Sequence, residues 1–313
     1  MVKNGKKKIR NFANYFYECF MRCKDEKFRR FVLNNYNNPN VIEILDVGNK
    51  YSGKIVYDIE AFGHSVGFFA EFLYVLIRLY FAEEHGFVPY VNWGKDFLYY
   101  EKDSVRGESN AFLYYFDKVS EIEEVDDVAH LTYASNEQIA YTQKNLGTCG
   151  YAISVEYLDA LSRMVKKYIR YNKEVLLYLE RHYDMLLSGK KTLAVHFRGS
   201  DYRRQYNNHP IFVTIEQEIE QVSKLLDRGG YECIFLATDE QEAIEIYRKK
   251  FGNIVNYFDD VYRVSEENDS VAYSHSKREN HHYLLGLEVL RDQYMLTRCE
   301  GLVGGISNLT LSA

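Results

Sequence analysis

The sequence predicts an α/β protein of two domains, each with a parallel sheet covered by helices. Its 313 residues exceed the roughly 100–200 residues of one typical domain. Short apolar segments alternate with turns and longer helical patterns in both halves, which is typical of parallel strands joined by helices. Only three prolines occur, so long regular elements meet few breakers. The 46% hydrophobic and 27% charged residues exclude disordered, collagen-like and disulfide-dense chains.

Residues 1–45 are predicted to form a basic helical extension. Within residues 1–37, ten lysines and arginines stand against three acidic residues, so this segment carries +7 and the remainder −13. Its apolar residues recur at helical spacing and are Ile9, Phe12, Ala13, Phe16, Tyr17, Phe20 and Met21. Such a face suits an anionic membrane surface, although packing on the body or on a partner subunit is more common. Nucleic-acid binding is disfavoured because the body is acidic.

Residues 46–188 form the predicted first domain. Its expected elements begin with a strand at 54–59, a turn at 63–67, a helix at 68–84 and a strand at 88–93. Residues 95–150 are expected to hold loops, a short helix at 112–116 and inserted structure, and residues 155–187 form a helical region broken near Asn172. The apolar run at 66–82 has 17 residues and contains Glu71 and Arg78. It is shorter than the ~20 apolar residues of a membrane-spanning helix, so it predicts a helix buried in the domain core.

Residues 189–313 form the predicted second domain, which is Rossmann-like. Its expected elements are strands at 192–197, 233–237, 254–258 and 301–304, and helices at 212–226, 240–251 and 282–297. Ligands of such domains bind at the carboxyl ends of the strands. Neither a GxGxxG dinucleotide motif nor a P-loop motif occurs in the chain. The candidate site residues are therefore sought at the ends of these strands.

His196, Arg198 and Asp201 lie at the end of the first of these strands. His196 and Arg198 share one face because side chains alternate along a strand. The planar guanidinium of Arg198 suits bidentate contacts to a diphosphate. An Arg–Asp pair that braces the turn explains the same residues equally well.

Asp239 follows the next strand, after Ala237 and Thr238. Thr238 or Asp239 is suited to cap the following helix, with Glu240 in its first turn. The alternative is that Asp239 faces the ligand crevice.

A third cluster combines a glycine turn, Gly304-Gly305, with Ser307. If a helix begins near Asn308, its free N–H groups point toward the same crevice and favour an anion. Asp292, on the preceding helix, is suited to accept the two N–H donors on the edge of guanine. An ordinary surface aspartate beside Arg291 is the competing interpretation.

The five cysteines form no CxxC motif and no paired framework. Reduced thiols in a cytoplasmic protein are therefore expected, and the frequent Tyr and Asn indicate an AT-rich bacterial genome. Cys19 and Cys23 lack a His or Cys pair at zinc-like spacing, so no metal site is expected. Asp259-Asp260 resembles a metal-binding acidic pair, but it is expected on a loop without a phosphate role.

Taken in order, these motifs resemble those of the GDP-fucose-dependent fucosyltransferases. The resemblance is closest to the α-1,6 and nodulation-factor group, extends to the α-1,2 group through Asp201-Tyr202, and covers mainly residues 190–313. The motifs that carry it are His196/Arg198/Asp201, His209-Pro210, Ala237-Thr238-Asp239-Glu240, Asp292 and Ser307, with a less specific match of the Gly63–Gly67 loop that includes His64.

The resemblance implies a GT-B-type architecture of two Rossmann-like domains, inverting transfer, GDP-fucose as donor, a glycan acceptor and no metal cofactor. Arg198 would hold the β-phosphate, and His196 and Ser307 would contact the donor. Asp292 would read guanine and Asp239 would lie near the nucleoside. Gly63 and His64 would belong to a donor-binding loop.

Two departures from the family pattern stand out. Gly199 follows Arg198 where many α-1,6 members have a second arginine, a role that Arg203 or Arg204 would then take. The loop at 203–208 contains no acid, so the usual base that deprotonates the acceptor is missing, and Asp201 is the expected substitute. A non-catalytic nucleotide-sugar-binding protein, or a transferase for another GDP-sugar, is the alternative. The helix begun at Asn308 is short at Ala313, so we expect the natural chain to continue.

Overall fold

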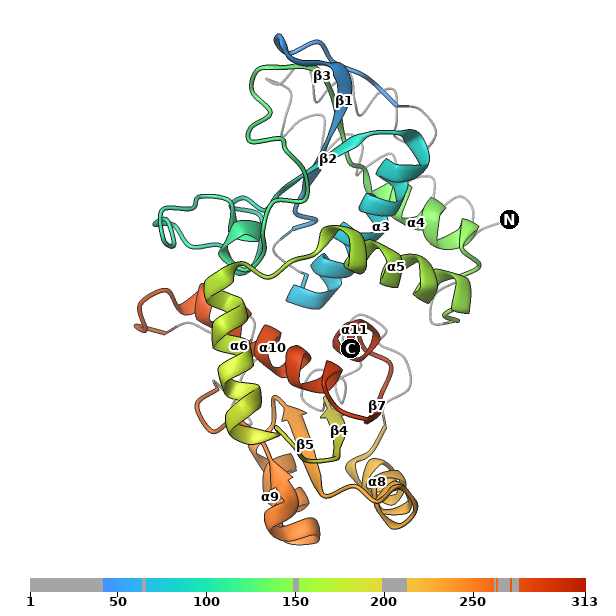
Figure 1. Cartoon of the computed structure of the whole chain (residues 1–313), viewed down its shortest axis with the longest axis vertical. Coiled ribbons are helices and arrows are strands. Elements are labelled where there is room, and N and C mark those ends of the chain that lie inside the picture. The colour runs from blue at the N-terminus through green and yellow to red at the C-terminus, as the bar shows by residue number, and fades with distance from the viewer. Residues whose placement is uncertain are drawn as a thin grey trace, which may run out of the picture. The chain divides into compact units, whose positions relative to one another are not determined.

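The computed structural model describes residues 42–63, 66–148, 152–198, 213–261, 263, 271 and 276–313. The chain divides into two compact units (Figure 1). The first holds the described residues up to Glu60 together with Tyr74–Asn92 and Lys118–Tyr168. The second holds Ala61–Leu73, Trp93–Asp117 and Ile169–Ala313. The predicted extension at residues 1–45 lies almost entirely outside the described residues.

The first unit contains a three-stranded parallel sheet in the order β2-β1-β3. Its strands are β1 (Lys50–Glu60), β2 (Val88–Asn92) and β3 (Val128–Tyr133), and its helices are α4 (Asn136–Asn145), α5 (Val155–Tyr168) and most of α3 (Phe68–His85). One face of β1 packs Val56 against Val128 and Leu131. On the other face the Tyr57 ring lies against Phe81 of α3, with ring centroids 5.9 Å apart. Alternation along the strand thus buries both faces of β1.

Strand β3 and helix α4 are elements that the sequence did not locate, since loops, one short helix and unspecified inserted structure were expected between residues 95 and 150. That helix is a 3₁₀ turn, η1 (Ala111–Tyr114). Helix α4 begins with a capping box, in which Ser135 and Gln138 satisfy each other's backbone N–H groups. This motif is visible in the sequence as Ser-x-x-Gln, and it is the signal that the reading of this region missed.

Two buried charged residues of helix α3, Glu71 and Arg78, hold the end of β1 and the loop after it. Arg78 donates hydrogen bonds to the Glu60 carbonyl at 2.8 Å and to Asn136 Oδ1 at 3.0 Å. Glu71 Oε2 accepts the backbone N–H of Phe62 at 2.9 Å. Both side chains are buried, so their polar partners offset the cost of removing charge from water. Within the described residues, no helix has the length and hydrophobicity that crossing a membrane requires.

The second unit contains a four-stranded parallel sheet in the order β6-β5-β4-β7. The strands are β4 (Thr192–Phe197), β5 (Cys233–Thr238), β6 (Val255–Asn256) and β7 (Gly301–Gly304). All twelve residues of β4 and β5 are buried, which explains why the sequence located these central strands well. Edge strand β6 is shorter than the predicted 254–258, and the buried Phe258 lies beyond its end.

Helices cover both faces of this sheet (Figure 1). They are α6 (Lys173–Leu186), α8 (Ile215–Gly229), α9 (Gln241–Phe251), α10 (His281–Thr297) and α11 (Asn308–Ser312), with a 3₁₀ turn, η3 (Gly252–Ile254), after α9. Leu193, Val195 and Phe197 of β4 pack in one core with α8 and α9. Helix α10 contacts β4 and β5. The alternate side chains of β4, including His196, therefore face away from the α8–α9 core.

N-cap residues determine where two of these helices begin. Helix α8 begins at Ile215 rather than near residue 212, because Thr214 forms a capping box with Gln217. The break predicted near Asn172 is confirmed, because Asn172 is the N-cap of α6 and accepts the N–H of Val175 at 3.0 Å.

Candidate functional site

His196 and Ser307, predicted from motifs 111 residues apart in sequence, meet at the carboxyl edge of the second sheet. His196 is the penultimate residue of β4 and pairs with Ala237 of β5 and Gly304 of β7. Its Nδ1 atom lies 2.8 Å from Thr310 Oγ1 and 3.3 Å from Ser307 Oγ. The ring therefore has a fixed neighbourhood formed by the chain that follows β7.

Ser307 is the N-cap of the short helix α11, and its Oγ accepts the N–H of Thr310 at 3.1 Å. The two hydroxyl oxygens lie 2.9 Å apart. Thr310 is a residue of this site that the sequence reading missed. The signal was available, because the third residue after an N-cap serine lies one turn into the helix, beside the capping side chain.

Gly304 allows this close packing. A Cβ atom at this position would lie 3.1 Å from the His196 carbonyl oxygen and 3.2 Å from Thr310 Oγ1. Both contacts are tighter than ordinary van der Waals contact, so a side chain at Gly304 would push Thr310 or β4 away. Close packing therefore requires glycine at position 304, a requirement that the sequence alone did not reveal.

Burial, and to a lesser extent the positive charge of Arg198, lowers the pKa of His196 to about 3. The imidazole is 7% exposed and is therefore neutral at physiological pH. Arg198 directly follows β4 and is half-buried. Its positive charge acts on the His196 ring, which agrees with the alternation of β4 that puts the two side chains on one face.

Asp239 follows β5, and the β4–β5 register pairs Phe197 with Thr238. Arg198 and Asp239 thus leave neighbouring strands at the same level. The prediction that Thr238 or Asp239 caps the following helix is wrong, because Glu240 occupies the N-cap of α9. Thr238 Oγ1 instead accepts the Glu240 N–H at 3.2 Å and closes a turn.

Asp292 lies on α10 and is partly exposed, beside the buried Arg291. Burial raises its pKa to about 7, against the opposing effect of Arg291 and Arg263. Arg291 is itself buried and pairs with Asp260 through two hydrogen bonds of 2.5 and 3.0 Å. Its guanidinium also lies 3.7 Å from the centroid of the Phe258 ring. Asp260, from the acidic pair noted in the sequence, is thus engaged by an arginine.

The remaining predicted residues are only partly visible. Gly63 has a φ of 148°, which favours glycine, and lies in the loop before α3. His64, Asp201 and His209-Pro210 lie outside the described residues, as do Arg203 and Arg204. Among the residues that are described, no group of three or more His, Cys, Asp or Glu side chains is placed to hold a metal ion.

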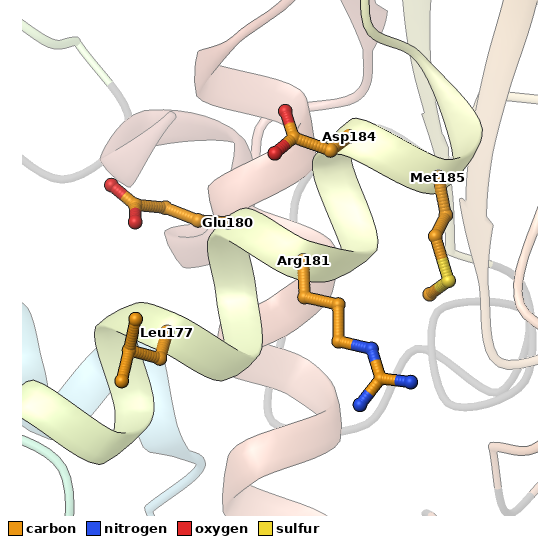
Figure 2. A pocket seen from close by; sticks show the side chains of 5 residues that line it. All are labelled: Leu177, Glu180, Arg181, Asp184 and Met185. Atoms are coloured by element: carbon orange, nitrogen blue, oxygen red, sulfur yellow. The ribbon is translucent and has the colours of Figure 1, made fainter.

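A separate hollow lies on the surface of α6 (Figure 2). Its lining residues are Leu177, Glu180, Arg181, Asp184 and Met185. None of them was predicted to belong to the site. Leu177 and Met185 are well exposed, and the two acidic side chains point away from Arg181 in Figure 2. This hollow therefore supplies control positions rather than site residues.

No family model matches the chain, and no curated protein sequence matches it. Solved structures do share its fold. The NodZ α-1,6-fucosyltransferase soaked with GDP-fucose aligns with a TM-score of 0.50 and 16% identity over 83% of this chain and 91% of that one. The fucosyltransferase NodZ from Bradyrhizobium aligns with a TM-score of 0.50 and 15% identity over 83% and 92%. The predicted α/β fold of GT-B type, with parallel sheets in two units, is thereby confirmed.

Proposed function

We propose that this chain is an inverting glycosyltransferase that moves fucose from GDP-fucose to a hydroxyl group of a glycan. The observation that carries the proposal is the meeting of His196, Ser307 and Arg198 at the carboxyl edge of β4 and β7, in a fold shared with a fucosyltransferase. That edge is where parallel α/β sheets bind their ligands. The resemblance of the sequence motifs points to the same donor.

The donor lies, in this proposal, on the domain formed by residues 189–313. Arg198 binds the β-phosphate, and His196 and Ser307 contact the donor beside it. Asp292 accepts the N–H groups of guanine, Asp239 lies near the nucleoside, and the loop of Gly63 and His64 completes the donor site. The oxygen atoms of a diphosphate can accept two parallel hydrogen bonds from the planar guanidinium of Arg198.

The transfer step forms a bond between an acceptor oxygen and C1 of fucose. The bond from C1 to the β-phosphate oxygen breaks, and GDP leaves with the electron pair. Arg198 stabilises the charge that grows on the leaving phosphate, without a metal ion. Asp201 takes the acceptor proton. Attack from the side opposite the leaving group inverts C1, which requires one base and no covalent enzyme intermediate.

The acceptor, in this proposal, binds to the domain of residues 46–188 and belongs to a bacterial surface polysaccharide or oligosaccharide. The protein acts in the cytoplasm. The basic segment at residues 1–37 supports peripheral contact with the inner face of the membrane, because its positive charge and aromatic residues suit an anionic lipid surface.

The deciding experiment is a donor screen that measures nucleotide release from GDP-, UDP- and ADP-sugars. We expect release of GDP from GDP-fucose and none from the uridine and adenine donors. Met185→Ala, in the hollow on α6, is the matched surface control and should retain full turnover. Turnover of a UDP-sugar in preference to GDP-fucose would overturn the proposal.

A non-catalytic nucleotide-sugar-binding protein is the second candidate, because the loop at residues 203–208 carries no acid. Binding alone does not separate the two functions. GDP-fucose binding without any GDP release, with a panel of glycan acceptors present, would favour the second candidate. Release from a different GDP-sugar would retain the transferase and change the donor.

A further inference from the structure

We propose that Thr310 is a positioning residue that sets the tautomer of His196, so that the ring presents an Nε2–H group to an oxygen atom of the donor nucleotide. The proposal rests on the proposed function for its ligand. It concerns the cluster of His196, Ser307 and Thr310, in which three polar atoms lie within 3.3 Å of one another.

A count of the available hydrogen-bond donors and acceptors supports this tautomer of His196. Each hydroxyl has one proton to donate, and Ser307 Oγ already accepts the Thr310 N–H at 3.1 Å. If Ser307 donates to Thr310 Oγ1 and Thr310 donates to His196 Nδ1, both hydroxyl protons have acceptors. Nδ1 is then an acceptor, and the single ring proton is on Nε2.

The fully reversed chain of hydrogen bonds, in which Thr310 donates to Ser307, leaves a donor without an acceptor. If Nδ1–H donates to Thr310 and Thr310 donates to Ser307, the Ser307 proton must point elsewhere. Ser307 is 6% exposed, and its Oγ has no further acceptor within the described part of the chain. A buried unsatisfied hydroxyl costs about 1–3 kcal/mol, so the first direction is favoured.

The neutral state of the ring makes its tautomer decisive. An imidazolium would donate from both nitrogens, whereas a neutral ring donates from one. Burial and the charge of Arg198 both keep His196 neutral. A neutral N–H beside a guanidinium binds an oxygen acceptor without adding a second positive charge to the buried site.

Two pairs of variants test the proposal in the full chain. Thr310→Val removes the hydroxyl at nearly constant shape, and Thr310→Ser restores it. His196→Gln keeps an N–H near the Nε2 position, whereas His196→Asn places its amide near the Nδ1 position. Tautomers are read by ¹⁵N NMR of histidine-labelled protein, with the His196 signal assigned by its loss in His196→Gln. GDP binding is measured by calorimetry.

We expect a protonated Nε2 in the unaltered protein and in Thr310→Ser. Thr310→Val should shift the ring toward Nδ1–H and weaken GDP binding about tenfold, which equals about 1.4 kcal/mol. His196→Gln should bind GDP more tightly than His196→Asn. A purely structural role for Thr310 would change thermal stability but leave the tautomer unchanged.

Protonation at Nδ1 in the unaltered protein would overturn the proposal. So would a Thr310→Val protein that shows the shifted tautomer and binds GDP as tightly as before. If Thr310→Val fails to fold, the spectra of the unaltered and Thr310→Ser proteins and the two His196 variants still decide. Failure of the unaltered protein to bind GDP would remove the proposed function and the nucleotide contact, whereas the NMR result would still decide the role of Thr310.

Discussion

The Tyr247 hydroxyl donates a hydrogen bond of 2.8 Å to Oε1 of Glu218 in the core beneath the four-stranded sheet. Glu218 lies on α8 and is 2% exposed, and Tyr247 lies on α9 and is fully buried. Burial raises the pKa of Glu218 to about 8 and also raises the pKa of Tyr247 well above its usual value. Glu218 is therefore protonated in the folded protein at neutral pH, and this bond joins the two helices that cover one face of the four-stranded sheet.

This pair makes stability depend on pH. The folded protein retains the Glu218 proton up to about pH 8, whereas an unfolded glutamate loses it near its ordinary pKa of about 4.3. The stabilisation is thus fully present below about pH 4.3 and is lost progressively as the pH rises toward 8. Glu218→Gln still accepts from Tyr247 but cannot ionise. We expect urea denaturation to show a flatter decline of its unfolding free energy between pH 5 and 8.

Tyr247→Phe is the control for this prediction. It removes the hydrogen bond without removing the buried carboxyl, so it should cost about 1 kcal/mol. Because that bond lowers the pKa of Glu218, the pH dependence should persist in this variant and extend to slightly higher pH. Equal slopes for Glu218→Gln and the unaltered protein would assign the pH dependence to other groups.

Under the proposed function, we expect Asp292 to give donor binding a pH dependence. Only the ionised carboxylate accepts both N–H groups of guanine, and the pKa of Asp292 in the folded protein is about 7. We expect the affinity for GDP-fucose to fall as the pH is lowered from 8 to 6, because a growing fraction of Asp292 is protonated. The sugar nucleotide is the better probe, since the terminal phosphate of GDP titrates in the same range.

Asp292→Asn separates this effect from general loss of affinity. The variant should lose the preference for guanine over uridine nucleotides and should bind with little change between pH 6 and 8. His196 does not contribute in this range, because its pKa is about 3. The same pH dependence in Asp292→Asn would remove the guanine role, as would equal affinity of the unaltered protein for GDP and UDP.

The elements predicted well from the sequence are those whose signal is local. Strand β4 has six consecutive buried residues, and Asn172 lies between two amphipathic patterns as a capping residue. Strand β3 has a His and two Thr/Tyr positions within six residues, so it lacked a continuous apolar run. Its pairing with β1 supplies what the sequence pattern did not show.

The site was predictable in its strand ends and not in its contacts. Strand order brings β4 and β7 together, so two motifs distant in sequence were expected at one edge. The approach of Thr310 to His196 depends on the absence of a side chain at Gly304, which is a three-dimensional packing condition. The pairing of Arg291 with Asp260, rather than with its neighbour in sequence, depends likewise on the approach of α10 to the segment that follows β6.

We predict transfer without a divalent metal ion. Arg198 is proposed to stabilise the charge on the leaving phosphate. Asp260, of the acidic pair that resembles a metal site, is already paired with the buried Arg291. Full turnover should therefore persist in EDTA, measured by GDP release with the chelator in excess of trace metals. Activity that disappears in EDTA and returns with Mn²⁺ or Mg²⁺ would contradict this, and it would indicate that a metal ion supplies the charge assigned to Arg198.

Arg198 is the residue whose removal should matter most. It follows β4 beside Asp239 at the strand edge, and its charge acts on the buried His196. Loss of one preorganised donor at a developing charge typically costs about 10²–10³ in turnover, or roughly 3–4 kcal/mol. Arg198→Ala should lose turnover by that factor with its fold retained, as circular dichroism and thermal unfolding would check. Arg198→Lys should recover little, because an ammonium group does not reproduce the bidentate fork.

His196→Ala serves as the comparison, because it should weaken donor binding more than it lowers turnover at saturating donor. The kcat and KM values of the three variants, measured by GDP release, distinguish these effects. We expect far less than about a tenth of the original turnover to remain in Arg198→Ala. A folded Arg198→Ala protein that keeps more than about a tenth would show that another group stabilises the leaving phosphate. An Arg198→Ala protein that unfolds would instead favour the competing interpretation, in which Arg198 braces the turn after β4.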